Sequence, residues 1–380
     1  MLKDKAVSWF LQNMIIPKHE VIDNPGFILS NITKANGEKT YLRDILIPES
    51  FFEKLEINVV NKYGNVGKEV LYSIGKKYGY LYASLQNFPV KTKSSKKTII
   101  NFAYIFARYL EGTDASYVKY DINVDTNIFK VWLKDYIICR HDGLGLIMTA
   151  GATGGIWAWV CGDIHLESIQ TACQGSGAAL CEVICAPVQE LNKLSKNIYV
   201  ENDVLTYVFD NEYETRNKLR SAKYSKNSLK TLLDNNFISY KNSIFSYHDK
   251  RLLMNESHIL FLVEAEMKKL DKGNDILFEC SFNEGKEIAS VYGNEDWDKF
   301  IMDFFPALGF GDITILNQRN PTVGLIYYPW TKLFKESDYT IIRGILSGVI
   351  SHCTGKETKL SLKNVEVGEY TNIVLVANGT

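Results

Sequence analysis

The sequence predicts an α+β fold built as two tandem units, each an antiparallel sheet packed against helices, which together form a pseudo-dimer. Glycines of the first unit recur 193 positions later, as the pairs Gly151/Gly344, Gly155/Gly348 and Gly162/Gly355. A second block recurs 206 positions later, as the pairs Leu71/Leu277, Gly79/Gly285 and Ala83/Ala289. In each copy, helical spacing of apolar residues gives way to strand-like alternation. A duplicated sequence usually encodes a duplicated fold.

These repeats predict the organisation of the 380 residues. We expect an N-terminal arm at 1–25, a first unit at 26–188, a polar connector at 189–233 and a second, divergent unit at 234–380. The change of spacing from 206 to 193 places about 13 extra residues in the first copy.

The first unit begins with helices. Glu49-Ser50, and Glu256-Ser257 in the second copy, precede apolar segments, so we expect each serine to cap a helix. Apolar residues spaced by three and four predict a helix over 70–82 and another over 99–110.

Strands follow these helices. Alternating residues predict a strand pair at 117–124 and 128–133, matched by 312–318 and 322–330 in the second copy. A glycine-rich helix comes next, and then two strands, at 164–170 and 179–186. We expect the glycines to allow a close approach of this helix to the sheet. No Gly-x4-Gly-Lys-Ser/Thr phosphate loop is present.

The bulk composition excludes some function classes. A formal net charge of −1 provides no basic surface for nucleic acid. Residues 143–162 are uncharged, as in a membrane helix, but their counterpart holds Arg343 and His352, so we expect a buried helix and no membrane span. An odd set of seven cysteines and no signal-like N-terminus predict a cytoplasmic protein with reduced thiols.

Three segments resemble the 4-vinyl reductase domain. They are LYSIGKKYG (71–79), AGATGGIWAWVCG (150–162) and QTACQGSGAALCEV (170–183). That domain also forms the sensor of aromatic-responsive bacterial regulators, and its fold is similar to that of TRAPP vesicle-tethering subunits. The resemblance covers about 160 residues of the first copy. It implies a hydrophobic pocket between helices and sheet for a small, mostly apolar ligand, and it implies association with a protein partner or as a homo-oligomer.

Aromatic residues are the candidates for lining this pocket. The set is Phe102, Tyr104, Phe106, Trp132, Trp157 and Trp159. Large flat side chains suit an apolar guest, although each residue taken singly also suits an ordinary core. Trp157 and Trp159 point about 200° apart on a helix, so at most one of them faces a given pocket.

The resemblance also implies a zinc site, because some family members hold a structural zinc. Cys173 and Cys181 match two of its ligands, whereas Gln170 stands at the position of a ligand glutamate and the family's first cysteine has no counterpart. Zinc requires four ligands. Cys161, His165, Glu167 or Cys185 are candidates to complete the set. The alternative is that the cysteines are small buried residues.

The sequence therefore predicts binding of a small hydrophobic or aromatic molecule, for sensing, carrying or presenting it to a partner. Two alternatives stay open. One is an enzyme acting on an apolar or polyketide-like substrate, with Glu167 or Cys161 carrying a shifted pKa. The other is a TRAPP-like assembly scaffold.

Overall fold

A computed structural model describes most of the chain. The described residues are 6–7, 9–10, 20–33, 39–113, 115–136, 147–205, 220–241, 244–292, 296–329, 337–366 and 372–377. Within these ranges, antiparallel sheets pack against helices, which confirms the predicted α+β class. No helix in the same ranges is long and apolar enough to cross a membrane.

The same order of elements occurs twice along the chain. The first series is β3 (Lys39–Pro48), α3 (Glu49–Tyr63), α4 (Asn65–Leu85), α5 (Lys96–Thr113), β4 (Tyr117–Asn123), β5 (Ile128–Lys134), α6 (Ile147–Cys161), β6 (Leu166–Ala172) and β7 (Cys181–Pro187). The second is β10 (Lys250–Glu256), α10 (His258–Met267), α11 (Gly273–Tyr292), α12 (Trp297–Ala307), β11 (Asp312–Asn317), β12 (Thr322–Ile326), α13 (Thr340–Thr354), β13 (Leu360–Glu366) and β14 (Asn372–Ala377). The domain boundaries stay a prediction.

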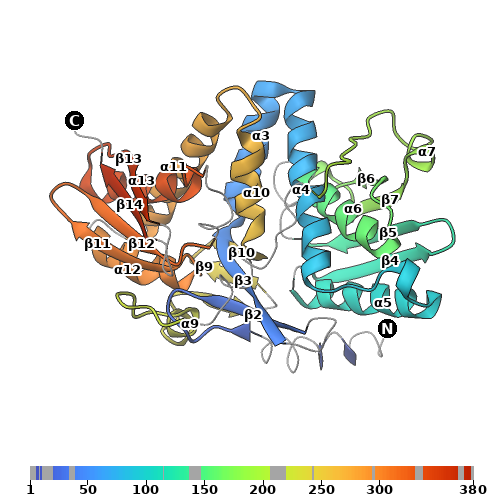
Figure 1. The fold of residues 1–380 in the computed structure, drawn as a ribbon, viewed down its shortest axis with the longest axis horizontal. Helices are drawn as coiled ribbons and strands as arrows, with labels where there is room; N and C mark the ends of the chain where they lie inside the picture. The colour runs from blue at the N-terminus through green and yellow to red at the C-terminus, as the bar shows by residue number, and fades with distance from the viewer. Residues whose placement is uncertain are drawn as a thin grey trace.

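The two halves meet in a shared central sheet. Its strand order is β1 (Glu20–Val21), β2 (Ile28–Thr33), β3, β10, β9 (Ile244–Tyr247) and β8 (Ser239–Lys241). Strands β3 and β10 pair antiparallel at its middle, with Pro48 opposite Leu252 and Asp44 opposite Glu256. In Figure 1, helices α3, α10 and α4 stand together above this sheet. Each half thus contributes strands and helices to one common centre.

Each half also carries its own outer sheet. The first has strand order β4-β5-β7-β6 and the second β11-β12-β14-β13, and Figure 1 shows them on opposite sides of the central helices. Along β5, Phe129, Val131 and Leu133 are buried, while Lys130 and Trp132 between them are only half-buried. This alternation is typical of a strand with one face on a core. Strand β6 forms an edge of the first outer sheet.

The recurring glycines bring two helices together, not a helix and a sheet. A Cβ placed on Gly79 of α4 would lie 1.9 Å from the carbonyl oxygen of Ala152 in α6. In the second half, a Cβ on Gly285 would lie 2.0 Å from the carbonyl oxygen of Ile345 in α13. These glycines are therefore required because helix backbones touch. The predicted helix–sheet approach is wrong for them and holds for Gly154, where a Cβ would lie 2.6 Å from Ser168 Oγ of β6.

The predicted serine caps are also wrong. Helix α3 begins at Glu49 with Pro48 as its N-cap, so Ser50 lies inside the first turn and its hydroxyl donates to Glu284 Oε1 at 2.9 Å. Helix α10 begins after Ser257, whose hydroxyl donates to the neighbouring Glu256 and accepts no helix N–H. In the first half the strand runs directly into the helix, and in the second half Ser257 occupies the N-cap position without making a capping hydrogen bond.

The connector contains helix α7 (Val188–Leu191) and helix α9 (Leu229–Asp234). Between them, residues 195–205 contain no helix or strand. This wall segment, as we call residues 195–205, contributes to the cavity described next.

Candidate ligand cavity

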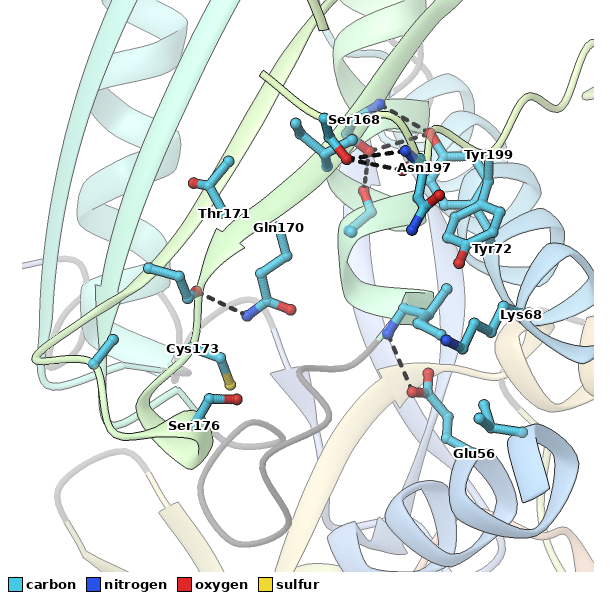
Figure 2. A pocket seen from close by; sticks show the side chains of 17 residues that line it. Glu56, Lys68, Tyr72, Ser168, Gln170, Thr171, Cys173, Ser176, Asn197 and Tyr199 are labelled. Carbon is cyan, nitrogen blue, oxygen red and sulfur yellow. Dashed lines mark hydrogen bonds between the residues drawn. The ribbon is translucent and has the colours of Figure 1, made fainter. Parts of the chain in front are cut away.

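The first half contains a partly open cavity of about 510 Å³. Five parts of the chain form it: α3, α4, the first turns of α6, strand β6 with the turn after it, and the wall segment. Figure 2 shows their side chains converging from these elements. The volume lies within the range of small-molecule sites, roughly 300–1,000 Å³.

Two tyrosines form an aromatic side of the cavity. The ring centroids of Tyr72 and Tyr199 lie 5.7 Å apart and the rings are tilted. Tyr72 is held rigidly, because its hydroxyl donates to Glu167 Oε2 at 2.7 Å and accepts the Ser168 N–H at 2.9 Å. Burial and the Glu167 charge raise the pKa of Tyr72 well above its usual value. Tyr72 is thus a fixed neutral wall and not an acid or base.

Glu56 lines the cavity floor, but its charge has a structural partner. Its two carboxylate oxygens accept the Ile147 N–H at 3.1 Å and the Met148 N–H at 2.9 Å. These are unsatisfied donors at the start of α6, and a carboxylate there also complements the helix dipole. Glu56 therefore fixes α6 against α3.

Other polar groups on the cavity are available for a ligand. Lys68, Asn197 and Tyr199 line it, and their side-chain polar atoms have no hydrogen-bond or ion-pair partner among the described residues. Figure 2 labels these three side chains around the space. They offer an ammonium, an amide and a phenol to a bound molecule.

The Gln170–Cys173 block supplies the wall opposite the helices. Strand β6 has a register shift between Gln170 and Ala172 in its pairing with β7, so Thr171 is an extra residue in the strand. A bulge re-aims side chains, and here consecutive residues of the block all line the cavity. Gln170 Nε2 donates to the Ala172 carbonyl at 3.2 Å, and the Thr171 hydroxyl donates to Glu182.

The predicted aromatic residues lie elsewhere. On α5, the rings of Phe102 and Phe106 stack with centroids 5.7 Å apart, and both contact Phe88. Tyr104 lies between them on the same helix and is half-buried. Trp132 is on β5, where the ammonium of Lys119 lies 4.9 Å from its ring centroid.

The two tryptophans of α6 belong to the hydrophobic core that lies against the first outer sheet. Trp157 is buried, stacks on Phe129 with centroids 5.0 Å apart, and donates its indole N–H to the Asn127 carbonyl at 2.9 Å. Trp159 donates to the Phe88 carbonyl at 3.0 Å. None of the six predicted residues is among those that line the cavity, and their role in ligand binding stays a prediction.

Cys173 and Cys181 are both buried, and the Gln174 N–H lies 3.4 Å from Cys181 Sγ. Within the described part of the chain, no group of three or more His, Cys, Asp or Glu side chains is placed to hold a metal ion. The described residues therefore do not fit the zinc site that the resemblance implies, and zinc binding stays a prediction.

The two residues of the enzyme alternative do not line the cavity. Glu167 is fully buried and accepts hydrogen bonds from Lys76 Nζ at 2.6 Å and from the Glu201 N–H at 3.1 Å, besides Tyr72. Burial raises the pKa of Glu167, and the charge of Lys76 opposes that change. Burial raises the pKa of Cys161 to about 12, so its reactive thiolate is scarce.

The second half has an arginine at the position that corresponds to Ala150. Arg343 stands 193 positions after Ala150, which lines the cavity. Its guanidinium carbon lies 5.8 Å from the ring centroid of Phe278, the counterpart of Tyr72. Glu264 accepts the Ile341 N–H at 2.9 Å and so fixes α13 as Glu56 fixes α6. The two halves thus differ at this position, where Ala150 lines the cavity and Arg343 carries a long charged side chain.

Comparisons with known proteins give little further guidance. No protein-family model matches the sequence, and no relative is found among curated proteins. Among solved structures, the phenol-responsive sensory domain of the transcription activator PoxR with phenol is similar at 14% identity and a TM-score of 0.34. The match covers 52% of this chain and all of that domain. A similarity of this size does not establish a shared family or ligand. The resemblances to the 4-vinyl reductase domain and to TRAPP subunits stay predictions.

Proposed function

We propose that the protein binds a small aromatic molecule with polar substituents in the cavity of its first half. The observation that carries this proposal is a partly open space of about 510 Å³, lined in part by Lys68, Asn197 and Tyr199, whose side-chain polar atoms have no hydrogen-bond or ion-pair partner among the described residues. Its aromatic and apolar sides come from Tyr72, Tyr199, Ile147 and Ala150. An unpaired polar group gains most from a ligand that satisfies it.

The residues that line the cavity indicate the size of the ligand and its polar substituents, which the sequence alone does not. An engineered cavity of about 150 Å³ holds benzene, so this larger space suits one or two rings with substituents. Lys68, Asn197 and Tyr199 favour hydroxyl or carboxylate groups on such a ring. In this proposal the molecule is sensed, carried or presented, and the output passes to a partner protein or a second copy of the chain.

Titration calorimetry with phenol, catechol and salicylate tests the proposal. Catechol adds a second hydroxyl to the phenol ring, and salicylate adds a carboxylate to it. Native mass spectrometry of the purified protein reports any co-purified molecule. We expect binding at one site, with salicylate favoured through Lys68. Lys68→Met should weaken salicylate and leave phenol unchanged, because only the charged probe loses its partner.

Ala150→Arg is the matched cavity-filling variant, because the second half accommodates arginine at the corresponding position 343. We expect it to lower probe affinity at least about tenfold and to keep the wild-type melting temperature within a few degrees. Ile105→Arg, at an exposed position on α5, is the control and should bind normally. The proposal fails if the purified wild-type protein carries no small molecule and binds none of the probes, or if Ala150→Arg binds as the wild type does.

A further inference from the structure

The wall segment forms one side of the cavity without belonging to a helix or strand. Ser195, Asn197 and Tyr199 line the space from this segment, across from β6, which is an edge strand. A segment outside regular structure needs side-chain contacts to hold its position. The contacts that do so are concentrated at Glu201.

Glu201 tethers the wall segment in three ways. Its backbone N–H donates to Glu167 Oε1 at 3.1 Å, its carboxylate accepts the Ser73 hydroxyl, and Lys77 Nζ lies 3.4 Å from the same carboxylate. Its side chain is 15% exposed. Burial raises the pKa of Glu201, but the hydrogen bonds from Ser73 and the Asp203 N–H, together with Lys77, outweigh burial and leave that pKa below its usual value. The tether is therefore charged.

The residues of α4 that hold Glu201 also hold the second half. Lys77 Nζ lies 3.0 Å from Glu266 Oε1, and the Ser73 hydroxyl lies 3.2 Å from Glu266 Oε2. Glu266 belongs to α10, and the side chains of Lys77 and Glu266 are 2% and 1% exposed. The buried ammonium of Lys77 thus lies between the carboxylate of Glu201 in the wall segment and the carboxylate of Glu266 in the second half. At this depth, moving either carboxylate changes the interaction of the other with Lys77.

The opposite contact between the halves provides an internal comparison. There, Lys54 of α3 pairs with Glu284 at 3.1 Å and also with Glu287, and both glutamates belong to α11. In this contact too, one lysine ammonium lies between two carboxylates. Neither of its carboxylates belongs to the wall segment, whereas the contact between α4 and α10 includes Glu201, two residues after the cavity-lining Tyr199.

We propose that Glu201 is a positioning residue of the cavity and that, through Lys77, it couples ligand binding to the contact between α4 and α10. This proposal rests on the proposed function of the same cavity. A ligand that orders Tyr199 and Asn197 fixes Glu201 against Lys77, and the interaction of Lys77 with Glu266 changes with it. Ligand binding therefore affects α10 of the second half, which lies in the shared centre of the molecule.

Glu201→Gln tests the proposal, because it keeps the size of the side chain and removes its charge. Glu287→Gln is the control, since it alters the opposite cluster and leaves the cavity intact. Calorimetry with salicylate measures affinity, and hydrogen–deuterium exchange follows residues 195–205 and 258–267 with and without the probe.

We expect Glu201→Gln to lower salicylate affinity about tenfold, the effect of losing one charged hydrogen bond. Exchange of 195–205 should be faster even without the probe. In the wild type, salicylate should slow exchange in both 195–205 and 258–267, and Glu201→Gln should abolish the slowing in 258–267. Glu201→Asp should restore part of the affinity, and Glu287→Gln should match the wild type.

The proposal is overturned if Glu201→Gln binds salicylate as the wild type does and still slows exchange in 258–267. A wild type that binds no probe refutes the proposed function instead. In that case, the exchange rates of 195–205 without probe are compared between Glu201→Gln and the wild type. Unchanged exchange in Glu201→Gln excludes a positioning role for Glu201.

Discussion

The contact between α4 and α6 makes a sharp prediction about two adjacent glycines. A Cβ on Gly155 would lie 2.1 Å from the Lys76 carbonyl oxygen and 2.6 Å from the Tyr80 nitrogen, both backbone atoms. A Cβ on Gly154 would lie 2.6 Å from Ser168 Oγ, which is a side-chain atom able to rotate. Alanine at 155 must therefore push two helices apart. Alanine at 154 meets only side-chain atoms among its nearest neighbours, the Ser168 hydroxyl and Cβ (3.1 Å) and the Tyr72 hydroxyl (3.3 Å), so it requires a rotation of the Ser168 hydroxyl and small side-chain shifts.

The magnitudes follow from these clashes. Both variants gain about 1 kcal/mol from replacing a helical glycine. Gly155→Ala must separate the backbones by about 1 Å, and we place its cost at or above the upper end of overpacking, about 3–4 kcal/mol, for a net loss of about 2–3 kcal/mol. Gly154→Ala breaks the Ser168 hydrogen bond to the Ala150 carbonyl, which is 2.5 Å long. That loss of about 1 kcal/mol is offset by the gain in helix propensity.

Urea denaturation followed by circular dichroism measures both variants under identical conditions. We expect Gly155→Ala to be less stable than Gly154→Ala by about 2 kcal/mol or more. Gly348→Ala is the corresponding variant in α13, where a Cβ would lie 2.0 Å from the Phe282 carbonyl oxygen, and it should be similarly destabilised. Equal stability of the 154 and 155 variants would refute the backbone-contact explanation.

Three further predictions concern charged and thiol groups. Lys76→Met should cost about 3–5 kcal/mol in urea denaturation, because it leaves the buried Glu167 without its cation. Adding Glu167→Leu should restore only part of that loss, because the Tyr72 hydroxyl and the Glu201 N–H then lose their acceptor. Native Cys161, with a pKa of about 12, is about one part in 10⁴ thiolate at pH 8, so peptide mass spectrometry should find iodoacetamide labelling slow until the protein unfolds. Burial raises the pKa of Glu287, but Lys250 and Lys54 outweigh it and lower that pKa, so its stabilisation is present above pH 4.5 and is lost as pH falls through the folded-state pKa. Glu287→Gln should therefore lose less melting temperature than the wild type between pH 6 and pH 3.

Each of these outcomes has a result that contradicts it. A Lys76→Met protein as stable as the wild type would mean that Glu167 is neutral in the fold. Fast labelling of Cys161 at pH 8 would show that α6 opens readily. If the melting temperatures of Glu287→Gln and the wild type fall equally between pH 6 and pH 3, Glu287 does not contribute to the loss of stability in acid.

Periodicity predicted individual elements well. The spacing over 70–82 lies within α4, and the alternating segments at 117–124 and 128–133 correspond to β4 and β5. These patterns are local, because a helix or strand with one buried face repeats its apolar residues at its own period. The serine caps failed because they depend on contacts beyond the local pattern: Pro48 takes the N-cap position before Ser50, and the hydroxyl of the N-cap Ser257 donates to Glu256 instead of accepting a helix N–H.

The candidate cavity was only partly predictable. The block at 170–173 was recognised by its residues and lines the cavity, yet Glu56, Lys68 and Tyr199 carried no recognisable signal. They lie on two helices and a connector, in segments that a sequence pattern does not relate to each other. Their meeting depends on the approach of α4 to α6 and on the tether at Glu201.

By itself, the sequence determined the α+β class and the spacing of the repeated glycines, since both are recorded in the order of residue types along the chain. Tertiary structure alone decided that those glycines join α4 to α6, that the two halves share one sheet, and that a cavity opens beside Ala150 in the first half. The physical reason is that contacts between backbones, buried charges and empty volume depend on which distant segments meet, and that information is absent from any local pattern.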